Sequence, residues 1–112
     1  MIVLSTTASK KEAKALGKLL LEKRLVACVQ RLKIKSMYRW ENTLCKAKEY
    51  LLILKTTKEN LNELESIVKA NHSYEVPQFV ALKADFISKE YKKWLEKECK
   101  SVKNSKKIKL KF

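Results

Sequence analysis

Residues 31–56, RLKIKSMYRWENTLCKAKEYLLILKT, decide the fold of this chain. Up to residue 41 the sequence alternates between two kinds of side chain. The even positions are mostly apolar or aromatic, and they are Leu32, Ile34, Ser36, Tyr38 and Trp40. The odd positions are mostly charged, and they are Arg31, Lys33, Lys35, Met37, Arg39 and Glu41. Because successive side chains of a β-strand point to opposite faces, this alternation predicts one long amphipathic strand.

The rest of the stretch predicts a second strand that returns beside the first. The polar residues 42–48 can turn the chain. The segment EYLLILKT, residues 49–56, is then apolar enough for its centre to be buried on both faces. We therefore expect a long β-hairpin whose turn lies within residues 42–48.

A strand and a helix precede the hairpin. Residues 2–5 form a short apolar and β-branched run, which predicts a buried first strand. Ser9 and Glu12 have the spacing of a capping box, in which each side chain can accept a hydrogen bond from a free backbone N–H of the first helical turn. The apolar residues that follow at helical spacing are Ala13, Leu16, Leu19 and Leu20.

Two more helices and one more strand follow the hairpin. A second helix can start within residues 56–60 and end near Asn71, a residue type that tolerates the left-handed backbone found at many helix ends. Residues 79–86, FVALKADF, predict a fourth strand. Ser88 can then cap a third helix.

The resulting order, β-α-β-β-α-β-α, is that of an α+β, ferredoxin-like βαββαβ sandwich with an additional C-terminal helix. At 112 residues the chain has room for one core, and we expect a single domain over residues 1–102. Residues 103–112 hold five lysines and no acidic residue. They form a basic C-terminal tail that either adds an edge strand or is disordered.

The formal net charge of +14 is the least ordinary bulk property, because so basic a surface attracts polyanions. A solvated, lysine-rich surface and a nucleic-acid-binding surface both fit this charge.

The apolar runs are too short to cross a membrane, and the three cysteines include no CxxC pair, so we expect a cytoplasmic protein with reduced thiols and no membrane partner. Cys28 has apolar neighbours and is expected in the core, whereas Cys45 lies in the expected turn and should be exposed.

The sequence offers few groups for catalysis. It has one histidine, no glycine-rich phosphate loop and no Gly-x-Ser-x-Gly elbow. We therefore expect no enzymatic activity and no required cofactor. A nucleic-acid-binding module of this fold would usually carry an RNP1-like Arg/Lys-Gly-Phe/Tyr stretch, which is also missing.

Tyr38 and Trp40 lie at the far end of the long strand, beyond what a sheet with strands of ordinary length would cover. Exposed aromatic residues of this kind predict oligomerisation, in which a neighbouring subunit covers them. The alternative is that the tail or the third helix covers them within one chain.

A second candidate site is HSYEVP, residues 72–77. His72 is the only histidine, and with Glu75 it could supply two ligands to copper or zinc if neighbouring subunits supply the others. The alternative is a lone histidine that caps or hydrogen-bonds. The candidate residues of a subunit interface or pocket are Tyr38, Trp40, Tyr74 and Pro77.

Five motifs in register resemble the CutA divalent-ion tolerance family. They are Leu25-Val26-Ala27-Cys28-Val29, Tyr38-Arg39-Trp40-Glu41, LLILKT at residues 51–56, His72-x-Tyr74-Glu75-Val76-Pro77, and Tyr91 with Trp94-Leu95. The resemblance covers about residues 1–98. It implies a homotrimer of ferredoxin-like subunits whose hairpins reach across to their neighbours, a cytoplasmic setting, and the binding and tolerance of divalent cations such as copper.

Two departures from the family bear on metal binding. Some members have a metal-binding cysteine where this chain has Ser5, and a His-His pair where it has Asn71-His72. Because copper(I) prefers sulfur ligands, we expect metal binding here to be weak. The favoured function is a non-enzymatic trimer for copper tolerance and homeostasis, and the alternatives are a basic nucleic-acid-binding module and a small-ligand-binding signalling trimer.

Overall fold

The computed structural model describes residues 1–101, and the predicted tail at residues 103–112 lies outside this part of the chain. The elements are β1 (Ile2–Thr7), α1 (Lys10–Glu22), β2 (Cys28–Trp40), β3 (Thr43–Lys55), the short 3₁₀ helix η1 (Lys58–Asn60), α2 (Leu61–Ala70), β4 (Val80–Leu82) and α3 (Lys89–Glu98). Apart from η1, this is the predicted order of strands and helices.

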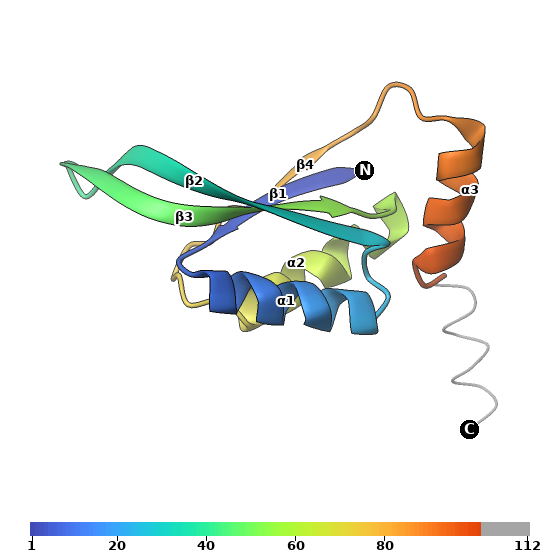
Figure 1. Ribbon diagram of the computed structural model, residues 1–112, viewed down its shortest axis with the longest axis horizontal. Coiled ribbons are helices and arrows are strands. Elements are labelled where there is room, and N and C mark those ends of the chain that lie inside the picture. The colour runs from blue at the N-terminus through green and yellow to red at the C-terminus, as the bar shows by residue number, and fades with distance from the viewer. Residues whose placement is uncertain (102–112) are drawn as a thin grey trace.

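The four strands form one antiparallel sheet in the order β2-β3-β1-β4. Helices α1 and α2 lie side by side on one face of it, and α3 lies beyond one end (Figure 1). Among residues 1–101, no helix covers the length of the other face (Figure 1). This is the ferredoxin-like arrangement, so the predicted fold class is confirmed.

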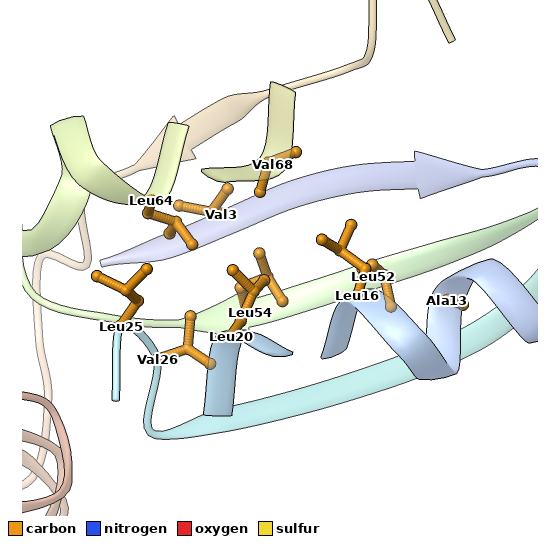
Figure 2. Close-up of a cluster of buried hydrophobic side chains, with 10 residues drawn as sticks. All are labelled: Val3, Ala13, Leu16, Leu20, Leu25, Val26, Leu52, Leu54, Leu64 and Val68. Atoms are coloured by element: carbon orange, nitrogen blue, oxygen red, sulfur yellow. The ribbon is translucent and has the colours of Figure 1, made fainter. Parts of the chain in front are cut away.

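The core lies between the sheet and the two helices (Figure 2). Its buried side chains are Val3, Ala13, Leu16, Leu20, Leu25, Val26, Leu52, Leu54, Leu64 and Val68. Alternate residues of β3 and the helical stripes of α1 and α2 supply most of them, as the apolar spacing predicts.

The hairpin turn is shorter than predicted. β2 and β3 pair in continuous register from Cys28 with Lys55 to Trp40 with Thr43, so only Glu41 and Asn42 form the turn. Both have positive φ, 47° and 62°, as a tight hairpin turn of the type I′ class requires. The predicted turn at residues 42–48 was wrong because the polar side chains there mark an exposed strand.

The hairpin projects beyond the rest of the sheet. The pairing of β1 with β3 ends at Thr7 and Tyr50, so residues 34–49 are paired only with one another. We call this two-stranded segment the ribbon. In Figure 1 it extends past the helices, at the opposite end of the molecule from α3.

The predicted fourth strand is also shorter than expected. β4 stops at Leu82, which pairs with Ile2 at the start of β1. Residues beyond Leu82 therefore have no neighbouring strand with which to pair, whatever their β propensity.

Two of the predicted helix starts are capped as expected, at Ser9 and Ser88, whereas Thr57 before η1 and Asn60 before α2 make no side-chain capping hydrogen bond. Ser9 accepts a hydrogen bond from the Glu12 N–H at 3.1 Å, and Ser88 accepts one from the Tyr91 N–H at 3.3 Å. Asn71 differs from the prediction, since its φ of −116° is not left-handed. It instead closes α2 by donating from Nδ2 to the Ile67 carbonyl at 2.9 Å.

Candidate functional site

The register of the hairpin places Tyr38 and Trp40 on the sheet face opposite the helices. Leu52, which packs against the helices, is directly opposite Arg31. The odd-numbered residues of β2 therefore share the helix side of the sheet, and the even-numbered residues share the other side. The predicted common face of Tyr38 and Trp40 is confirmed, and both side chains are partly exposed.

A groove of about 700 Å³ lies on that face, between the ribbon and the loop that connects α2 to β4. Its walls are residues 73–78 of the loop, Thr6 of β1, and Ser36, Met37, Tyr38, Trp40, Cys45 and Glu49 of the ribbon. The structure thus brings together all four predicted pocket residues, together with Glu75.

A hydrogen bond joins the two walls of the groove. The Tyr74 hydroxyl donates to Oε2 of Glu49 at 2.7 Å, and Glu49 is only 6% exposed. Burial of the phenol, and then the hydrogen bond and negative charge of Glu49, raise the pKa of Tyr74 well above its usual range. Tyr74 therefore stays protonated and acts as a donor at any physiological pH.

His72 fixes the loop between α2 and β4 without lining the groove. Its imidazole is 0% exposed, with Nε2 at 2.7 Å from the Thr6 carbonyl oxygen. Nδ1 accepts a hydrogen bond from the Tyr74 N–H at 3.0 Å. These partners assign the proton to Nε2, which donates to Thr6, so both ring nitrogens are occupied.

Glu12 ties the same loop to the start of α1. Its carboxylate accepts hydrogen bonds from the Ser73 N–H at 2.7 Å, the Ser73 hydroxyl at 2.9 Å and the Ala8 N–H at 3.2 Å. Partial burial acts to raise the pKa of Glu12, but the hydrogen bonds from Ser73 and Ala8 outweigh it, and the pKa is lowered. The capping box is thus modified, since Glu12 binds Ala8 and the loop.

The predicted metal ligands do not fit this arrangement. His72 has no free nitrogen and does not line the groove, whereas Glu75 does. Ser5 is fully buried and donates to the Gln78 carbonyl at 2.7 Å, so it also holds the loop. Within residues 1–101 no group of three or more His, Cys, Asp or Glu side chains is arranged to hold a metal ion.

The cysteines also differ from the prediction. Cys45 lies within β3 opposite Tyr38, and it is half-buried in the groove wall. Cys28 is half-buried at the start of β2, because it faces the side of the sheet without helices. Glu49 and Glu12 are site residues that the sequence patterns did not predict. Glu49 could have been noticed because its carboxylate lies on the apolar face of the hairpin, opposite Ile34.

Fold and groove together define a class: a small ferredoxin-like binding domain with a projecting aromatic ribbon. The chain also matches, over residues 1–98, the family described as CutA1 divalent ion tolerance protein. It is 38% identical to the divalent-cation tolerance protein CutA of Thermotoga maritima, over 85% of this chain and 94% of that one. It is 40% identical to the protein of the same name from Thermus thermophilus, over 84% and 92% of the two chains. The chain belongs to the CutA family.

Solved structures agree with this assignment. CutA1 from Oryza sativa superposes with a TM-score of 0.87 at 35% identity, covering 89% of this chain and 93% of that one. CutA1 from Pyrococcus horikoshii gives a TM-score of 0.86 at 33% identity, covering 89% and 98%. The likeness therefore includes the ribbon as well as the core, since so little of either chain is left out.

The names of relatives point to more than one cellular location. A structure of CutA from Archaeoglobus fulgidus is described as periplasmic, and the relative from Arabidopsis thaliana is named as chloroplastic. Among residues 1–101, no helix combines the length and apolar character that a membrane span requires. The predicted cytoplasmic location stays a prediction.

Proposed function

We propose that this chain is the subunit of a cytoplasmic homotrimer that contributes to copper tolerance without catalysing a reaction. The observation that carries the proposal is the exposed aromatic ribbon. Membership of a family named for divalent-cation tolerance supports the cellular role. The ribbon supports the assembly, because a surface of this kind needs a partner in water.

The ribbon is poorly suited to exist alone. An isolated two-stranded segment is at best marginally stable in water. Trp40 is 47% exposed and Leu44 is 66% exposed, on opposite faces of the ribbon. Helix α3 lies at the opposite end of the molecule from the ribbon and does not cover it (Figure 1). Neighbouring copies of the same chain would bury both faces at once.

The only histidine of the chain supports the non-enzymatic part of the proposal. A general base needs a free lone pair within reach of substrate. The imidazole of His72 is buried, and its Nδ1 lone pair already accepts the Tyr74 N–H. His72 is thus a structural residue that fixes the loop.

The cellular role is tested in a bacterial host from which its own relative has been deleted. Expression of this chain is expected to raise the copper concentration that the host survives. The Trp40→Ala variant, which should not assemble, is expected to give less protection at equal protein level. Equal copper thresholds with the wild-type chain and with an empty vector would contradict the proposal.

Removing the His72 side chain is expected to leave copper binding unchanged. Both of its ring nitrogens are engaged within the chain, so a metal ion would have to break one of these contacts first. Calorimetric titration of copper(II) into wild type and His72→Ala should therefore give equal heats, measured where both are folded by circular dichroism. Loss of the heat in the folded variant would restore His72 as a ligand.

A further inference from the structure

The groove is free of positive charge in a chain that is otherwise strongly basic. The sequence has 26 Lys and Arg residues against 12 Asp and Glu. Even so, none of the described residues that line the groove is basic, and two of them, Glu49 and Glu75, are acidic. The alternation of the ribbon explains the segregation. Lys35 and Lys48 are paired with each other on the helix side of the sheet, whereas most ribbon residues of the groove belong to the other side.

Glu49 is a buried carboxylate without a positive partner. It is 6% exposed, and within residues 1–101 its carboxylate accepts one hydrogen bond, from the Tyr74 hydroxyl. No lysine or arginine of the described chain forms an ion pair with it. A buried carboxylate is costly unless a cation or several hydrogen bonds compensate it, so this position favours a bound cation.

The other walls indicate what kind of cation fits. Tyr38 and Trp40 line the groove with aromatic rings, and Val76 and Pro77 add apolar surface. Aromatic faces attract ammonium and guanidinium groups, and apolar walls bind an attached hydrocarbon body. A metal ion would instead require several hard or soft ligands together, and the described residues contain no such cluster.

We propose that the groove binds a small organic cation, with an ammonium or guanidinium head group beside Glu49 and an apolar body against Val76 and Pro77. The volume of about 700 Å³ is ample for such a ligand. The proposal does not depend on copper. The same head groups also occur on lysine and arginine side chains, so a neighbouring subunit is the other source that the experiment has to distinguish.

The test uses the full chain and calorimetric titration of butylammonium and butylguanidinium, with butanol as the uncharged control of equal length. At least one of the two cations is expected to bind, and butanol is not. Glu49→Gln is expected to weaken the binding by about tenfold or more, because it removes the charge while leaving an oxygen for the Tyr74 hydroxyl. Glu59→Gln, which removes an exposed carboxylate outside the groove, is the matched control and should bind as wild type does.

Sedimentation of the same samples separates the two sources of the cation. If Glu49→Gln changes the subunit assembly and neither cation binds to wild type, the positive group is a side chain of a second copy and the proposal is overturned. Equal affinity for butanol, or equal affinity of Glu49→Gln and wild type, also overturns it. None of these results contradicts the proposed role in copper tolerance, which is read from cell survival.

Discussion

Trp40→Ala is expected to give a folded monomer at micromolar concentrations at which the wild-type chain sediments as a trimer. Trp40 is the last residue of β2, beside the turn, and it lies outside the buried core. Its removal should therefore cost the single chain little. Central aromatic residues of interfaces typically contribute about 2 kcal/mol or more each to binding, and a trimer would lose this contribution three times.

Leu21→Ala is the matched control for this experiment. Leu21 is exposed to a similar degree, at 43% against 47% for Trp40, but it belongs to α1 on the other side of the sheet. This variant should remain a trimer. A wild-type chain that sediments as a folded monomer, or a Trp40→Ala variant that stays fully assembled, would contradict the proposed assembly.

Local sequence patterns were sufficient to predict the fold because each reports a local physical constraint. The alternation from Arg31 to Trp40 identified a strand and its two faces, and Ser9 and Ser88 identified the helix starts. Polarity was misleading in the ribbon. Lys46 and Lys48 have the composition of a loop, but they belong to a strand whose helix-side face has no helix over it. Polarity indicated exposure there, and it could not distinguish a turn from an exposed strand.

The site was less predictable, because its contacts join residues that are far apart in sequence. Tyr74 and Glu49 are 25 positions apart, and His72 and Thr6 are 66 positions apart. The sequence indicated His72 as a candidate metal ligand because it is the only histidine. In the structure, His72 instead forms hydrogen bonds with Thr6 and Tyr74, which was the alternative interpretation. Tyr38, Trp40, Tyr74 and Pro77, the candidate interface or pocket residues, line one groove. The role of Glu49 could not be predicted, because in the sequence it comes directly before an apolar run.

Leu52→Ala is expected to reduce the free energy of unfolding by about 2–5 kcal/mol, because truncation of a buried leucine loses apolar contacts and leaves a cavity. Leu52 of β3 is 0% exposed and lies beside Leu16 of α1 in the core (Figure 2). Urea unfolding should be measured in the Trp40→Ala background, since subunit dissociation would otherwise add to the unfolding free energy.

Leu44→Ala in the same background shows that the loss comes from burial. Leu44 belongs to the same strand and the same face as Leu52, but it is 66% exposed on the ribbon. In a monomer its truncation should change the unfolding free energy by less than about 0.5 kcal/mol. Equal losses for the two variants would mean that the ribbon packs against its own subunit. The argument for a trimer would then fail, because a ribbon that is buried in its own subunit has no exposed apolar surface for a neighbouring subunit to cover.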